Sequence, residues 1–242
     1  MVTFRVNPKT LANTLHNALT MAKGKKPVQP LILLRYDYRP GGKGELTAIG
    51  VSQYSAGMDW CEVEGGTDGH AEIRVLGANP EKTDVVDDLT KLASSVRSTS
   101  AAASALVTVT IEHKQRMTVE YGTELLGELG DGDEYDLTTG MDGQPGTFDI
   151  VEDLIYQVND CPQPDGPVAL NLDIIARCKD LKIMESQVMD LAAHPDPTKN
   201  LVGVAVGPRF RGLVASIDRA VYAKGGPWLD GPGDASHLLG SS

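Results

Sequence analysis

The sequence predicts an α+β fold in which a β-α-β-β-β unit repeats along the chain. Apolar residues recur at helical spacing in several segments, and runs of alternating apolar and polar residues, typical of strands, follow each of them. Gly, Pro and Asn residues separate these runs as turn formers do. A helix that buries one face on a small antiparallel sheet leaves its other face open. We therefore expect the helices on one face of antiparallel sheets.

The first unit opens with a predicted strand at Thr3–Val6. Asn7 is a favourable N-cap for the next helix, and Pro8 suits the first helical position. One face of this helix is apolar. We expect the opposite face to be open to solvent, and it carries Lys9, Asn13, His16, Asn17, Thr20 and Lys23. Gly24 is expected to end the helix. The three strands that follow are predicted at Leu31–Tyr38, Glu45–Val51 and Ser55–Glu64.

The second unit has the same order and begins with a strand at Ala71–Leu76 and a helix at Asp84–Ser98. Its remaining strands are predicted at Leu106–His113, Arg116–Tyr121 and Glu124–Leu129. The elements of the third unit are predicted at Val168–Leu170 (strand), Leu172–Leu181 (helix), Val188–Ala193, Leu201–Val206 and Phe210–Ile217 (strands). The order repeats with little residue identity, so this is a repeat of architecture.

An acidic, glycine-rich stretch at Gly130–Gly146 is interpreted as a connector between two domains. The first domain is expected to comprise residues 1–139 and the second, shorter one residues 140–219. In the second, Phe148–Val158 has apolar residues at helical spacing, and we interpret it as the helix of a fourth, reduced unit. Residues 220–242 are rich in Gly, Pro and Ser and are expected to form a flexible tail.

The charge of the chain is unevenly distributed. The formal net charge is −11, whereas a DNA-binding domain is usually basic. However, the segment Pro8–Lys26 contains four lysines and no acid, so the rest of the chain carries −15. An acidic body with one basic element suits a protein that meets phosphates on one surface only. A solvated basic helix without a partner would have the same composition.

The sequence contains no motif for catalysis, metal binding or membrane insertion. Its three cysteines are far apart and form no C-x-x-C pair, and no H-E-x-x-H, Walker loop, G-x-S-x-G or G-x-G-x-x-G is present. The acidic stretch Asp131–Asp142 lacks the Gly and the Glu that a calcium loop requires. No apolar run approaches the roughly 18 residues that span a bilayer. We expect a protein without enzymatic activity, cofactor or metal.

Several segments between Phe4 and Leu129 carry a family resemblance in their order and pattern. They read F-R-V, N-P-K-T-L-A-N-T-L, K-P-V-Q-P-L-I-L-L, G-E-L-T-A-I-G-V-S, S-A-G-M-D-W, D-D-L-T-K-L-A-S-S-V and V-T-V-T-I-E-H-K-Q-R-M-T-V-E-Y-G. In this order they resemble the first domain of a bacterial DNA sliding clamp. The third unit, Pro167–Arg219, resembles half of such a domain. The resemblance covers about half of the chain.

The resemblance implies a sliding-clamp fold and a DNA polymerase processivity factor, a ring around duplex DNA with no chemistry of its own. It implies a cytoplasmic protein whose partners are duplex DNA, a DNA polymerase, a clamp loader and further copies of the chain. The length is closer to that of phage clamps, which suggests a bacteriophage source. Rings of this family contain twelve helix-bearing units. Four units per chain would give a trimer, which we favour by counting Phe148–Val158, and three would give a tetramer.

Two sets of site residues follow from this interpretation. The first is a DNA-facing set of basic side chains on the predicted helices, whose contacts with phosphates would be independent of base sequence. It comprises Lys9, Lys23, Lys25, Lys26, Lys91, Arg97, Arg177, Lys179 and Lys182. The second is an apolar pocket for a partner peptide near the connector. It comprises Leu137, Met141, Leu213, Val214 and Ile217, for which core packing is the alternative.

Two other classes of function remain open at this stage. One is a β-rich viral structural or interaction subunit, which would also form oligomers but would encircle no DNA. The other is a hydrolase whose catalytic residues converge only in space. The outward ends of the sheets bear on the choice, because an open strand edge invites pairing with another chain. Head-to-tail pairing of such edges makes a ring if the rotation closes.

Overall fold

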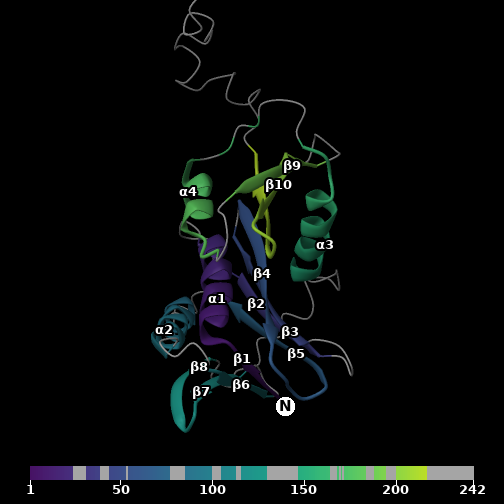
Figure 1. The fold of residues 1–242 in the computed structure, drawn as a ribbon. Helices are drawn as coiled ribbons and strands as arrows, with labels where there is room; N and C mark the ends of the chain where they lie inside the picture. The colour runs from purple at the N-terminus through teal and green to yellow at the C-terminus, as the bar shows by residue number, and fades with distance from the viewer. Residues whose placement is uncertain are drawn as a thin grey trace, which may run out of the picture.

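In the computed structural model, the described residues are 1–23, 31–38, 44–52, 54–76, 85–99, 105–112, 116–129, 147–163, 168, 170, 172–183, 188–194 and 200–216. The helices are α1 (Pro8–Ala22), α2 (Val85–Ser98), α3 (Thr147–Asn159) and α4 (Leu172–Asp180). The strands are β1 (Val2–Val6), β2 (Leu31–Tyr38), β3 (Gly44–Val51), β4 (Ser55–Val63), β5 (Gly69–Leu76), β6 (Val107–Glu112), β7 (Arg116–Tyr121), β8 (Glu124–Leu129), β9 (Met189–Ala193), β10 (Leu201–Val206) and β11 (Phe210–Ala215) (Figure 1).

The observed elements confirm the predicted order, and most of their ends differ from the predicted ones by two residues or fewer. In the predicted strand Val168–Leu170, the structure describes Val168 and Leu170, and of these two Leu170 forms a bridge with Ser216. Gly24, the predicted end of the first helix, lies outside the described residues, and Lys23 is the C-cap of α1. The predicted connector and tail also lie outside the described residues.

The strands form two antiparallel sheets, and the first strand of each unit joins the sheet of the other unit. Strand β1 pairs with β6, from Val2 opposite Ile111 to Val6 opposite Val107, in a sheet ordered β1-β6-β7-β8. Strand β5 pairs with β2, with Leu31 opposite Leu76. The two units are therefore joined by an exchange of strands.

The second sheet continues from the first two units into the third. Its order is β5-β2-β3-β4-β11-β10-β9, and β4 meets β11 with Met58 opposite Arg211 and Ser55 opposite Val214. We call this junction the β4–β11 seam. Strands β8 and β9 are edge strands, and they lie toward opposite ends of the molecule (Figure 1).

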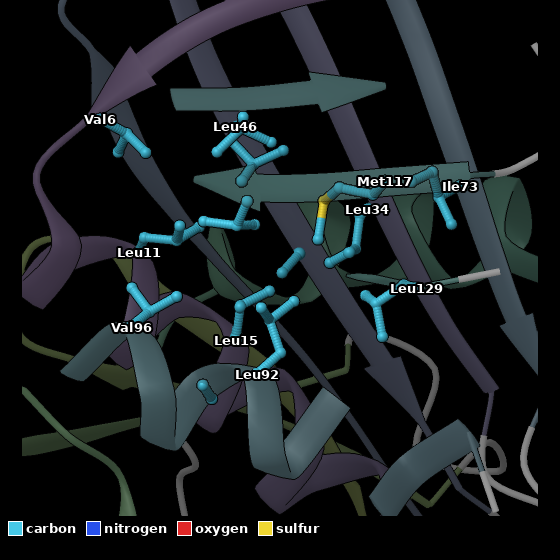
Figure 2. Close-up of a cluster of buried hydrophobic side chains, with 14 of the residues drawn as sticks. Val6, Leu11, Leu15, Leu34, Leu46, Ile73, Leu92, Val96, Met117 and Leu129 are labelled. Carbon is cyan, nitrogen blue, oxygen red and sulfur yellow. The ribbon is translucent and has the colours of Figure 1, made fainter. Parts of the chain in front are cut away.

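The main core lies between α1, α2 and both sheets. Side chains from these helices and from several strands meet in one cluster, which includes Val6, Leu11, Leu15, Leu34, Leu46, Ile73, Leu92, Val96, Met117 and Leu129 (Figure 2). Helix α1 lies very close to β3. A Cβ atom on Gly50 would lie 1.9 Å from the carbonyl oxygen of Ala18, so only glycine fits at this position.

Helix α1 begins as predicted and differs from the prediction in what surrounds it. The Asn7 side chain accepts hydrogen bonds from the backbone N–H groups of Lys9 (2.9 Å) and Thr10 (3.2 Å), which satisfies two open donors of the first turn. The face expected to be open is mostly covered, and its residues Asn13, Asn17 and Thr20 are buried. The reason is that α1 packs against α2 and α4 as well as against the strands.

Helix α3 corrects the expectation that all helices share one face. Along β2, Leu34 belongs to the core with α1, and its neighbour Leu33 packs with Phe148, Ile155 and Val158 of α3. Successive side chains of a strand point to opposite faces, so α3 covers the face of the sheet opposite to α1. Figure 1 shows α3 on the other side of the strands from α1, α2 and α4. We call the side with α1, α2 and α4 the helix face.

Candidate nucleic-acid interface

The basic residues predicted to meet DNA that the structure describes all lie on, or directly after, the three helices of the helix face. Lys9 is in the first turn of α1 and Lys23 is its C-cap, and both are exposed. Lys25 and Lys26 lie outside the described residues. Helix α1 has 15 residues, so its two lysines are separated by roughly 20 Å along the helix axis.

Helix α2 contributes two cations in different settings. The Lys91 side chain is 72% exposed, and its Nζ lies 3.1 Å from Oδ1 of Asp88. An exposed pair of this kind contributes little stability and is readily exchanged for a phosphate. Arg97, in the last turn, is half-buried and donates from Nη2 to Oδ1 of Asn13 on α1, at 3.2 Å. Arg97 is therefore held in place before any ligand binds.

Helix α4 and the residues after it contribute the other predicted cations. Lys179 and Lys182 are exposed. Arg177 instead donates from Nη1 to Oγ of Ser55 (2.9 Å) and Oγ of Ser52 (3.3 Å), and burial lowers the pKa of its guanidinium. This geometry gives Arg177 the structural role of joining α4 to the turn between β3 and β4.

A buried polar network, which the sequence did not single out, joins α1 to the third unit at the β4–β11 seam. The Asn17 side chain donates to Oδ2 of Asp59 (2.8 Å) and accepts from the backbone N–H of Lys182 (2.7 Å). Oδ1 of Asp59 accepts from the backbone N–H of Trp60 (2.8 Å) and lies 3.9 Å from Nε of Arg209. Burial raises the pKa of the Asp59 carboxyl, and Arg209, Asn17 and Trp60 oppose this shift. The only signal in the sequence is an acid at an inward position of a strand.

A second site that the sequence did not single out surrounds His16, halfway along α1. Its Nε2 lies 3.2 Å from the carbonyl oxygen of Asp180, at the end of α4. Burial lowers the pKa of the imidazole, and the positive charges of Arg97, Lys182 and Lys23 lower it further. Three of the predicted cations thus act on one ring, although they come from different segments of the chain.

This arrangement of basic side chains can bind anions. The helix face holds lysine and arginine side chains with hydrogen-bond donors directed at neighbouring polar groups or at solvent. Within the described part of the chain, no three His, Cys, Asp or Glu side chains gather in a way that would hold a metal ion. Among the same residues, no helix has the length and apolar character needed to cross a membrane.

Comparisons with known proteins give a result only at the level of structure. No protein-family model and no curated protein matches the sequence. Among solved structures, the DNA polymerase III beta chain of Streptococcus pneumoniae aligns over 100% of this chain and 69% of its own, with a TM-score of 0.56 and 7% identity. The sliding clamp of Bacillus subtilis aligns over 100% of this chain and 68% of its own, with a TM-score of 0.53 and 10% identity.

The DNA polymerase sliding clamp of Pseudomonas aeruginosa covers 90% of this chain at a TM-score of 0.50 and 12% identity. The protein has the fold of a DNA sliding clamp. The predicted α+β clamp fold is therefore confirmed. The chain spans 65% of the length of the Pseudomonas aeruginosa clamp.

Within this clamp fold, the structure describes two residues of the predicted partner-peptide pocket, and these two do not lie together. Leu213 and Val214 are consecutive in β11, so their side chains point to opposite faces of the sheet. Leu213 is buried against α3, and Val214 is buried in the cluster that includes α4. The two cannot line one pocket. Leu137, Met141 and Ile217 lie outside the described residues.

The clamp fold has a hollow in a different place, where the first unit meets the third. Its volume is about 470 Å³. Its lining residues come from the start of α1, the second half of β4, the residue after Lys182 and the turn before β11. They are Asn7, Thr10, Trp60, Glu62, Val63, Glu64, Ile183, Pro208 and Arg209.

The position of α3 also removes the basis of the expected trimer. That estimate counted four helices per chain on the helix face, and α3 lies on the opposite face. Among the described residues, three helices remain on the helix face. The number of subunits must therefore be argued from three helices per chain.

Proposed function

We propose that this protein is a DNA polymerase processivity factor. Copies of the chain would form a ring around duplex DNA with the helix face toward the hole, and the ring would tether a polymerase. A separate clamp loader would open the ring. The observation that carries this proposal is the clamp fold with three cation-bearing helices on the helix face.

The distribution of charge across the sheet supports the proposed orientation. The helix face carries Lys9, Lys23, Lys91, Arg97, Lys179 and Lys182, which outnumber the acids Asp87, Asp88, Asp173 and Asp180 on the same helices. The opposite face is covered by α3, which contains Asp149, Glu152 and Asp153 and no lysine or arginine. A phosphate backbone is attracted to the first face and repelled by the second. The acidic net charge of the chain is thus compatible with a ring that binds DNA only in its hole.

Two of the four terminal strands of the sheets, β8 and β9, support assembly through strand pairing. Edge strand β8 carries the exposed Leu125, and edge strand β9 begins with Met189, which is also exposed, after the exposed Val188. Open edges with apolar side chains are unfavourable in a monomer and favour pairing with another chain. We propose that β8 of one copy pairs with β9 of the next. With twelve helices per ring, as the resemblance implies, three per chain gives four subunits.

The test is topological. Once a clamp loader has placed the protein on nicked circular duplex DNA, the protein should remain bound and should leave after the DNA is cut once. In solution, its mass by light scattering should be four times the 25.8 kDa chain mass. The same protein should lengthen the products of a polymerase that recognises it. A monomer at micromolar concentration, or an oligomer that stays on DNA after linearisation, would contradict the proposal. An oligomer that never binds DNA would favour a viral structural or interaction subunit.

A further inference from the structure

His16 occupies a position where three helical segments meet. It lies in the middle of α1, next to the end of α2 and the end of α4. Its Nε2 is 3.2 Å from the carbonyl oxygen of Asp180. A carbonyl oxygen can only accept a hydrogen bond, so Nε2 carries the hydrogen. In the neutral ring, Nδ1 therefore has a lone pair, and it becomes a second donor when the ring is protonated.

Side chains of α1 hold the neighbouring groups in place around this ring. Asn13, one turn before His16, accepts the hydrogen bond from Arg97 of α2. Asn17, the next residue after His16, accepts from the backbone N–H of Lys182. Lys23 supplies a third positive charge from the end of α1. Arg97 is thus held by its guanidinium and Lys182 by its backbone before a ligand arrives.

The acids that the structure places beside this position, among the described residues, are Asp180 and Asp59. Asp180 turns its carbonyl oxygen to the ring, and its side chain is exposed beside the exposed Lys179 on the last turn of α4. Asp59, on the other side of Asn17, is engaged by Asn17, Trp60 and Arg209. The groups that act on His16 from α1, α2 and the end of α4 are therefore positive or neutral. Such a group of like charges is stabilised by an anion.

We propose that His16, Arg97, Lys182 and Lys23 form a phosphate-binding position, in which a backbone phosphate of duplex DNA accepts a hydrogen bond from protonated Nδ1 of His16. The identity of the phosphate as part of DNA rests on the proposed function. On binding, the ring takes one proton from solvent and becomes an imidazolium, and no covalent bond forms. DNA binding is therefore linked to proton uptake at this position.

Proton uptake by His16 on binding determines whether the affinity for DNA rises or falls with pH. Without a ligand, the pKa of His16 lies below its ordinary value, because burial and the three cations disfavour the charged ring. A bound phosphate favours the charged ring and raises this pKa. As pH rises from the pKa of His16 in the free protein to its pKa in the complex, affinity for duplex DNA should then fall by up to about tenfold per pH unit for one proton.

The experiment is an NMR pH titration of the histidine side chains in the full chain, alone, with a short linear duplex and with inorganic pyrophosphate. Either ligand should raise the pKa of His16. His70, which pairs with Asp37 at 2.8 Å on a different part of the molecule, serves as the internal control and should not respond. In parallel, duplex affinity should weaken at least about threefold from pH 5.5 to 7.5 for the native chain. The His16→Gln variant, which keeps an N–H donor for Asp180, should show a flat profile.

The outcomes separate this proposal from the proposed function. If the duplex binds and the pKa of His16 does not move, the phosphate position is wrong and the clamp proposal stands. If the short linear duplex does not bind, the pyrophosphate titration decides about the anion position alone, and the clamp proposal is decided by the experiment on circular DNA, because a ring leaves a duplex with open ends. An unchanged His16 in pyrophosphate would then overturn the anion position.

Discussion

Arg35 of β2 and Glu152 of α3 form a bidentate ion pair, with Nη1 at 2.6 Å and Nη2 at 2.5 Å from the two carboxylate oxygens. The two side chains are 20% and 14% exposed, and the Glu152 carboxylate raises the pKa of the guanidinium. The paired geometry fixes α3 in direction as well as in position, because both partners are planar and both contacts are made.

This pair should contribute measurably to the binding of α3 to the sheet. In a double-mutant cycle of Arg35→Ala and Glu152→Ala, we expect a coupling energy of about 1–2 kcal/mol in urea unfolding. Asp153→Ala, at an exposed neighbouring position of α3, is the matched control and should change stability by no more than about 0.5 kcal/mol. A coupling energy near zero would show that α3 is held by its apolar contacts alone.

Asp59→Ala should destabilise the protein, because Asn17 and Arg209 lose their buried partner. We expect a loss of about 2–4 kcal/mol in the free energy of unfolding. Burial raises the pKa of Asp59 in the folded state. The stabilisation that Asp59 contributes is therefore complete below its pKa in the unfolded chain, about 3.9, and is lost as pH rises through its pKa in the folded protein. The cost of the substitution should therefore be larger near pH 4 than near pH 7. Asp153→Ala, at an exposed position of α3, is the control, and a cost that grows with pH would contradict the assignment.

Two Gly→Ala substitutions separate close packing from backbone strain. Gly50→Ala would place a Cβ atom against the α1 backbone at Ala18, and we expect a loss of about 3 kcal/mol or more. Gly122 has a φ of 63° and open space around it, so Gly122→Ala should cost only about 1 kcal/mol. Thermal unfolding of both variants measures the difference. Equal effects would mean that α1 and β3 can move apart at little cost.

Variants at the two free edges test head-to-tail assembly. Leu125→Arg on β8 and Met189→Arg on β9 should each prevent ring closure, since a charge would be buried in the interface. Mixing the two variants should give a dimer, because each retains the edge that the other has lost. Light scattering distinguishes these species. Failure to form the mixed dimer, while each variant remains folded, would show that β8 and β9 do not pair.

Without DNA, His16 should lower stability in acid. The pKa of His16 lies below its ordinary value, so the folded protein favours the neutral ring. The stabilisation from this neutral ring is present above about pH 6.5 and is lost as pH falls through the pKa of His16 in the folded protein. Relative to His16→Gln, the native chain should lose a few tenths of a kcal/mol between pH 7 and 5, since solvent screens a half-exposed group. Urea unfolding at both values measures this. A relative gain in acid would indicate that an acid next to the ring has been overlooked.

Local patterns were sufficient to predict the elements of this protein and their order. Asn7 and Pro8 mark the start of α1 because capping needs only neighbouring residues, and short apolar runs separated by turn-forming residues identified β2, β7, β8 and β10. The resemblance in segment order predicted the clamp fold, and the cations of α1, α2 and α4 were found because a basic helix is visible in the sequence.

Only the tertiary structure decided which surfaces meet. The exchange of β1 and β5 between sheets, the Asn17–Asp59 contact and the side of the sheet that α3 covers depend on residues far apart in the chain. An amphipathic helix shows in its sequence that it has a face to bury, and either face of a sheet with apolar residues on both sides can receive it. The choice for α3 follows from partners such as Leu33 and Arg35, whose side of the strand becomes defined only when the sheet forms.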